Sequence, residues 1–170
     1  KPFKMSKRAG DFISVQDLLN EVDKDQIRFM MLSRSNDVEL DFDFDKVKEK
    51  SKENPVFYVQ YAYARINSLL RLINLSLLKK INLDQKSLTL NKMEEKIIRK
   101  VFEWPKIVDS ASRQFDLHKI PFYLYDLSTL FHAYWSKGND DKNYKFIENE
   151  KLRRNEILII INLVAIVIQN

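Results

Sequence analysis

The scarcity of glycine and proline is the feature that most limits how this chain can fold. Two glycines and four prolines interrupt 170 residues, which is too few for the many tight turns of a β-sandwich or barrel. Apolar residues make up 45% of the chain, enough to bury one sizeable core. We therefore expect an all-α fold, a helical bundle with little or no β structure.

Charge and cysteine content limit the kinds of partner, cross-link and metal site that the chain can have. The chain carries 29 basic and 24 acidic residues and no cysteine, which gives a mild bias towards a polyanionic partner and excludes disulfides and thiolate metal sites. No signal peptide is visible. The apolar run at residues 157–168 is too short to span a membrane, so we expect a buried helix, no membrane partner and a cytoplasmic location. We also expect this last helix to continue beyond Asn170.

The first part of the chain predicts a short helical connector. Apolar residues recur at helical spacing over residues 15–22 and again over 27–32, which favours two short helices with Asp23 or Asp25 as the N-cap of the second. Acidic residues then alternate with apolar ones over residues 37–45, so all five carboxylates share one side of an extended segment. A divalent-cation site is one interpretation, and a solvated face on a short connecting strand is the one we favour.

A long helical stretch at residues 46–78 contains Pro55, which predicts a kink or a break near Asn54. Beyond it, Gln60 and Asn67 point away from the core, and the apolar side chains fall on one stripe. The residues of this predicted buried stripe are Val59, Ala62, Ile66, Leu69, Leu70 and Ile73.

The second half of the chain predicts three further helices. After a polar linker at residues 82–91, a helix over 94–115 should kink at Pro105, and another should run from Pro121 to about Ser136. Residues 138–145 are expected to form a loop, with the last helix starting around Glu148.

The segment Lys4-Met5-Ser6-Lys7-Arg8 has the chemistry of a phosphate-binding loop, because two lysines three residues apart can close on a triphosphate. These five residues alone also fit an ordinary solvated basic segment. This segment and the residues that follow it resemble the lysine loop of class I aminoacyl-tRNA synthetases. The resemblance implies that all five residues bind ATP, supplied as its magnesium complex. It also implies that Lys7 and Lys4 are catalytic, Lys7 stabilising the transition state and Lys4 supporting the loop and nucleotide. No protein-bound metal is implied.

Aromatic residues and an arginine share one edge of the helix after Pro55. At 100° per residue, Tyr58, Tyr61 and Arg65 lie on one ridge beside the apolar stripe, where they could form a platform for unstacked bases. Spacing alone favours the alternative, in which both tyrosines are core aromatics and Arg65 pairs with an acid.

Residues 55–65 resemble the most recognisable stretch of the helical anticodon-binding domain of arginyl-tRNA synthetases, with Tyr63 where many members carry histidine. The resemblance implies that Tyr58, Tyr61 and Arg65 bind tRNA. The segment at residues 131–135 resembles a later aromatic segment of that family, which adds Tyr134, the better match, and Trp135. The two histidines, His118 and His132, lack ligand-spaced partners, so helix-end or core roles are expected rather than a zinc site.

Together these features predict two parts, residues 1–45 from the end of a catalytic domain and residues 46–170 as an anticodon-binding domain with a shortened end. The resemblance implies that the parent is an arginine–tRNA ligase acting on ATP, arginine and tRNA, a monomer, and that this piece alone is inactive because the nucleotide-binding half is missing. The alternatives are a fragment of the cysteine-specific class I enzyme and a non-catalytic interaction module that docks a protein on residues 157–168.

Overall fold

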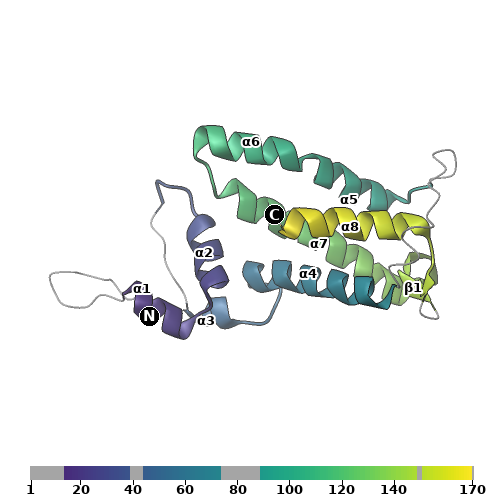
Figure 1. Cartoon of the computed structure of the whole chain (residues 1–170), viewed down its shortest axis with the longest axis horizontal. Coiled ribbons are helices and arrows are strands. Elements are labelled where there is room, and N and C mark those ends of the chain that lie inside the picture. The colour runs from purple at the N-terminus through teal and green to yellow at the C-terminus, as the bar shows by residue number, and fades with distance from the viewer. Residues whose placement is uncertain (1–13, 39–43, 74–88, 149–150, 170) are drawn as a thin grey trace.

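The structure is a computed structural model that describes residues 14–38, 44–73, 89–148 and 151–169. Five helices, α4 to α8, form a bundle, and three short helices lie beside one end of it (Figure 1). The all-α prediction is confirmed, with one small β-hairpin. The helices are α1 (Val15–Glu21), α2 (Lys24–Leu32), α3 (Phe44–Lys48), α4 (Pro55–Leu72), α5 (Lys92–Phe102), α6 (Trp104–Gln114), α7 (Lys119–Asp140) and α8 (Asn155–Gln169).

The two predicted helices of the connector are α1 and α2, and Asp23 is the N-cap between them. Its backbone N–H donates to the side chain of Gln26 at 3.2 Å, which satisfies a donor that the helix itself leaves free. Val22 and Ile27 then pack with Val47 of α3 in a small apolar cluster separate from the main core. The connector therefore has its own minor core.

The acidic alternating segment is only partly described, because residues 39–43 lie outside the described ranges. Asp37 lies in an exposed turn, and Asp45 lies in α3. The predicted extended segment is therefore wrong at its C-terminal end, where helical backbone replaces the strand. Within the described ranges no three acidic or histidine side chains are grouped as metal ligands.

Pro55 separates two helices, as predicted, rather than kinking one. It occupies the first turn of α4, where its missing N–H costs nothing. The buried side chain of Asn54 accepts hydrogen bonds from the N–H groups of Val56 (3.1 Å) and Phe57 (3.3 Å). Its amide nitrogen donates to the carbonyls of Val47 (2.6 Å) and Glu49 (2.8 Å). Asn54 thus starts α4 and anchors the segment after α3.

The predicted apolar stripe of α4 is buried, apart from half-buried Leu70. Gln60 is exposed as expected, and Asn67 is half-buried. The helix ends at Leu72 rather than at residue 78.

The predicted helix over residues 94–115 is two helices, α5 and α6, which meet at Glu103. Pro105 lies in the first turn of α6, so the break precedes the proline, as it did at Pro55. Helix α7 is longer than predicted and continues through Gly138 to Asp140. Only the end of the expected loop is irregular, and it includes a 3₁₀ turn at Lys142–Tyr144.

The last helix begins at Asn155 and not at Glu148, because a hairpin comes first. Strand β1 (Ile147–Glu148) pairs antiparallel with β2 (Lys151–Leu152), with Ile147 opposite Leu152. Both of these apolar side chains pack against the main core. Pairing across the two strands therefore brings both side chains onto the core at this end of the bundle.

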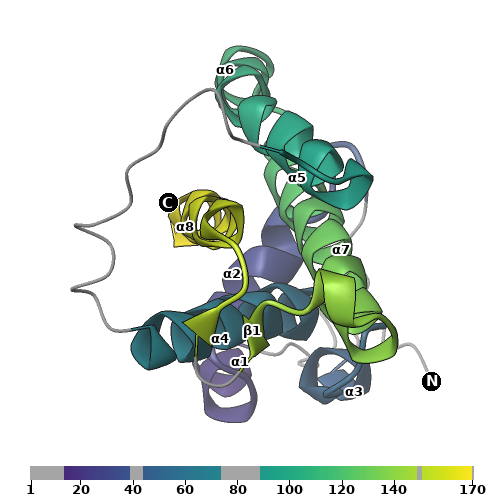
Figure 2. The same ribbon diagram turned by 90° about the vertical axis from the view of Figure 1, so that its right-hand side faces the viewer.

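Helix α8 supplies much of the core and lies against α4 and α5 (Figure 2). Most of its apolar side chains are buried, and Ile166 is the large one that is well exposed. The buried-helix interpretation is thus confirmed. The alternative that this surface docks a partner is wrong, because the bundle already covers it. Within the described ranges no helix is both long and apolar enough to cross a membrane.

Candidate nucleic-acid interface

Helices α4 and α7 pack side by side and together present an aromatic edge. Helix α4 contributes Tyr58, Tyr61 and Arg65 at spacings of three and four residues. Helix α7 contributes Tyr125, His132 and Trp135 at spacings of seven and three, which also places them on one face. We call these six residues the aromatic edge.

The guanidinium of Arg65 lies at the centre of the aromatic edge. Its Cζ is 4.2 Å from the ring centroid of Tyr61 and 5.0 Å from that of Trp135. One nitrogen donates to the Tyr61 hydroxyl at 3.0 Å, and the other donates to His132 Nδ1 at 3.0 Å. Aromatic faces and neutral acceptors therefore fix a cation in one orientation.

His132 connects the two helices. Because arginine can only donate, Nδ1 of His132 is the acceptor, and Nε2 carries the proton that is donated to the carbonyl of Tyr58 at 3.0 Å. Burial lowers the pKa of His132, and the charge of Arg65 lowers it further, while the bond to Tyr58 works in the opposite direction. The imidazole is therefore neutral at neutral pH, and its core role is confirmed.

The two tyrosines of α4 differ in exposure. Tyr58 is half-buried between Tyr125 (ring centroids 5.5 Å apart) and His132 (4.3 Å), and burial raises the pKa of its hydroxyl. Tyr61 is 41% exposed and stacks on Phe57 at 5.6 Å with an interplanar angle of 14°. Tyr61 therefore has ring surface that a ligand could contact, and Tyr58 packs beneath the exposed surface against Tyr125 and His132.

Arg65 has no ion pair within the described ranges. The alternative in which it pairs with an acid is therefore wrong for this part of the chain. Among the residues that the structure describes, its positive charge is met by aromatic faces and neutral acceptors, so the guanidinium could also bind an anionic or π-rich ligand.

Tyr134 does not belong to the aromatic edge. It follows Ala133 and precedes Trp135, so it points about 100° away from the Trp135 face, and its side chain is fully buried. Assigning this ring to base stacking is therefore wrong, because no part of it can reach a ligand. Trp135 is half-buried and contacts Phe131 and Phe146 as well as Arg65.

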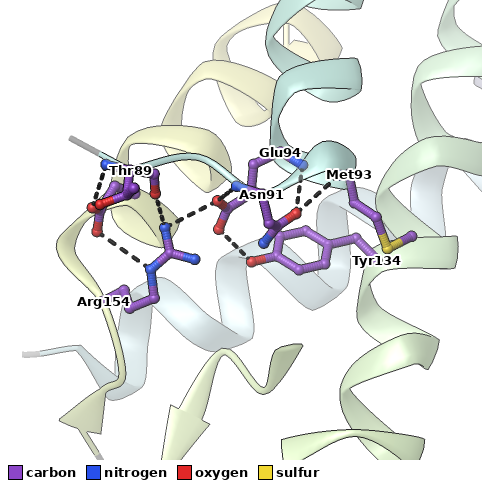
Figure 3. A network of polar contacts seen from close by, with 7 residues as sticks. Thr89, Asn91, Met93, Glu94, Tyr134 and Arg154 are labelled. Atoms are coloured by element: carbon purple, nitrogen blue, oxygen red, sulfur yellow. Dashed lines mark hydrogen bonds and ion pairs between the residues drawn. The ribbon is translucent and has the colours of Figure 1, made fainter. Parts of the chain in front are cut away.

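Tyr134 instead takes part in a buried polar network at the other side of α7 (Figure 3). Its hydroxyl donates to the fully buried carboxylate of Glu94 at 2.6 Å. Burial, together with this bond and the charge of Glu94, raises the pKa of Tyr134 far above its ordinary value. Glu94 also accepts from the N–H of Asn91 at 2.8 Å and from Arg154 at 3.1 Å. The buried carboxylate thus has a cationic partner and three hydrogen-bond donors, without which its burial would destabilise the fold.

The predicted phosphate-binding residues Lys4, Met5, Ser6, Lys7 and Arg8 lie outside the described residues. Their roles, including catalysis by Lys4 and Lys7, remain predictions from the resemblance.

Two contributors were missed by the sequence interpretation. Tyr125 packs on Tyr58, and His132 holds Arg65 in place. Their seven-residue spacing on an α7 face that also includes Trp135 is a signal that could have found them. Spacing alone does not predict which face of α7 packs against α4, because that depends on tertiary packing.

Comparison with known proteins shows the family to which the chain belongs. Residues 59–170 match the family described as DALR anticodon binding domain. The arginine–tRNA ligase of Pelagibacter ubique is 50% identical over 170 residues, covering 100% of this chain and 30% of that protein. The arginine–tRNA ligase of Ruegeria pomeroyi is 44% identical over 153 residues, which cover 88% of this chain and 26% of that protein.

A solved structure is also similar. A protein from Campylobacter jejuni assigned as an arginyl-tRNA synthetase has a TM-score of 0.76 and 26% identity, with 99% of this chain and 34% of that one covered. The chain thus spans about 30% of the length of the curated relatives. The family match extends over well over half of the sequence, from within α4 to the end of α8, and the chain therefore belongs to the DALR anticodon binding domain family.

Proposed function

We propose that this chain binds the anticodon loop of an arginine tRNA and forms part of an arginine–tRNA ligase. The observation that supports this most is the exposed Tyr61 ring with Arg65 fixed beside it and unpaired within the described ranges. The names of the curated relatives favour arginine over cysteine as the amino acid.

The chemistry of the aromatic edge suits an unstacked loop. A splayed base gains about 1 to 3 kcal/mol by stacking on an aromatic face. Tyr61 provides such a face, and the Arg65 guanidinium can stack on a second base or bind a phosphate. Because His132 and Trp135 already hold the guanidinium, little side-chain entropy is lost when RNA binds.

In the parent enzyme, the arginine carboxylate attacks the α-phosphate of ATP, which forms arginyl adenylate and releases pyrophosphate. The terminal ribose of the tRNA then takes the arginyl group and AMP leaves. By resemblance, Lys7 stabilises charge on the transferring phosphates and Lys4 supports the loop and nucleotide. We further propose a cytoplasmic, monomeric enzyme, and expect no arginine-dependent ATP–pyrophosphate exchange from these 170 residues alone.

The direct test is the affinity of the chain for an RNA hairpin that carries an arginine anticodon, compared with a hairpin of altered anticodon. Tyr61→Ala should weaken the arginine hairpin by about 1 to 3 kcal/mol. Tyr63→Ala is the matched control, since Tyr63 lies on the same helix off the ridge and should leave affinity within about 0.5 kcal/mol. Equal affinity for both hairpins, or no loss with Tyr61→Ala in a folded protein, would contradict the proposal.

A further inference from the structure

A small pocket lies between α4, the end of α7 and the segment that leads into β1. It is lined by Leu69, by Trp135, Gly138 and Asn139 of α7, and by Lys145 and Phe146. Its volume is about 190 Å³, below the roughly 300 to 1,000 Å³ of pockets that enclose whole small molecules. The size therefore suits one ring system rather than a complete metabolite.

The pocket continues the aromatic edge. Trp135 belongs to both, since the Arg65 guanidinium lies 5.0 Å from its ring centroid and the same residue lines the pocket. Leu69 follows Arg65 by four residues and so lies one helical turn further along the same side of α4. A strand that stacks on Tyr61 and passes Arg65 would reach this pocket next.

The lining has the chemistry that a nucleobase requires. Leu69, Trp135 and Phe146 give apolar and aromatic walls for the faces of a planar ring. Asn139 brings an amide that both donates and accepts, and Lys145 brings an ammonium that donates to ring nitrogens and carbonyl oxygens. Stacking walls and a few polar groups on one side are how proteins bind unpaired bases.

Gly138 permits the close packing that shapes this pocket. A Cβ at this position would lie 2.9 Å from the carbonyl oxygen of Tyr144 and 3.2 Å from the Cα of Lys145. The backbone that carries Lys145 can therefore approach α7 closely only because residue 138 has no side chain. Gly138 is buried in the last turn of α7. Glycine is disfavoured within helices, so its presence here is explained by the close approach of this backbone.

We propose that this pocket receives one splayed base of the RNA strand whose neighbouring bases stack on the aromatic edge. The proposal rests on the proposed function and adds a second, distinct contact for the same strand. It assigns Asn139 and Lys145 as residues that contact a base edge.

The test is a scan of abasic substitutions through the loop of the arginine-anticodon hairpin, with affinity measured for the full chain and for Asn139→Trp, whose larger side chain would occupy the pocket. In the original chain, one loop position that uses the pocket should lose about 5- to 150-fold on base removal. Asn139→Trp should bind the intact hairpin about 5- to 150-fold more weakly than the original chain does. Removal of the same base should then lower the affinity of this variant by less than about 2-fold. Lys145→Met should weaken the intact hairpin by about 3- to 10-fold.

Matched controls separate the pocket from general effects. Asn143→Trp and Lys142→Met make the same changes in the neighbouring turn outside the pocket and should change affinity by less than about 2-fold. If Tyr61→Ala weakens binding but the abasic profile of Asn139→Trp equals that of the original chain, the pocket proposal is overturned and the proposed function stands. If Tyr61→Ala has no effect either, the proposed function fails as well. Thermal unfolding of each variant verifies that it is folded.

Discussion

Two tyrosine–arginine pairs in this molecule have opposite surroundings. Tyr134 and Arg154 both bind the buried carboxylate of Glu94, whereas Tyr61 and Arg65 bind each other at an exposed edge with no carboxylate paired in the described ranges. In the first pair the arginine neutralises a charge that the fold has buried. In the second pair, which we propose binds RNA, the arginine has no carboxylate partner in the described ranges. The surroundings, and not the residue types, distinguish the structural pair from the proposed binding pair.

The largest effect is expected on stability from Arg154→Met. This change leaves the buried Glu94 side chain without its cationic partner, so we expect a loss of about 3 kcal/mol in the free energy of unfolding, measured with urea. Arg113→Met removes an exposed pair with Asp109 and should cost less than about 0.5 kcal/mol. Equal losses for the two variants would show that the buried network contributes no more than a surface pair.

Tyr134→Phe should have the next largest effect and sharpens the comparison directly. It removes the hydroxyl that donates to Glu94 at 2.6 Å while keeping the buried ring, so unfolding should become easier by about 1.5 to 3 kcal/mol. Affinity for the arginine hairpin should not change among folded molecules. A clear loss of RNA affinity with unchanged stability would return Tyr134 to the interface.

Arg65→Lys tests whether the exposed pair works through its planar guanidinium. Lysine keeps the charge but cannot stack on Tyr61 and Trp135 or donate in the same geometry, so hairpin affinity should fall by about 1 to 2 kcal/mol. The slope of affinity against salt should stay the same for lysine and fall by about 1 for Arg65→Met. Full affinity with lysine would mean that charge alone is used.

The smallest effect concerns pH. Because the folded pKa of His132 lies below its ordinary value of 6.5, the unfolded chain takes up a proton first as the pH falls. The contribution of His132 to stability is therefore complete above about 6.5 and is lost as the pH falls towards the folded pKa. The difference in unfolding free energy between the original chain and His132→Gln should shrink over that range. A difference that grows with acidity would contradict the neutral imidazole.

The sequence predicted those parts of the fold that depend on local rules. Helical spacing identified the buried stripe of α4, and the Asp23 cap and the break before Pro55 follow from nearby residues. The hairpin before α8 was missed, because two-residue strands have no periodicity and are stabilised by packing of Ile147 and Leu152 on the core. The length of α7 was underestimated, because Gly138 reads as a loop residue until the close approach of Tyr144 is known.

For the candidate site, spacing on α4 correctly placed three side chains on one ridge, whereas the resemblance on α7 included a side chain that is fully buried. Tyr58, Tyr61 and Arg65 share one ridge as predicted. Tyr134 and Trp135 are adjacent in sequence and so necessarily point in different directions, and only the packing of α7 shows which one faces the core. The contacts of Arg65 with His132 and Trp135 on α7 could not be predicted for the same reason.

The capping amide of Asn54 also has a rotational consequence for the aromatic edge. Its four hydrogen bonds fix the residue at which α4 begins. The direction in which each later side chain of α4 points is counted from that residue at about 100° per position. One residue inserted between Asn54 and Tyr58 would turn the row of rings by about 100° relative to the cap. The cap therefore sets the direction in which Tyr61, seven positions later, and Arg65, eleven positions later, point from the helix.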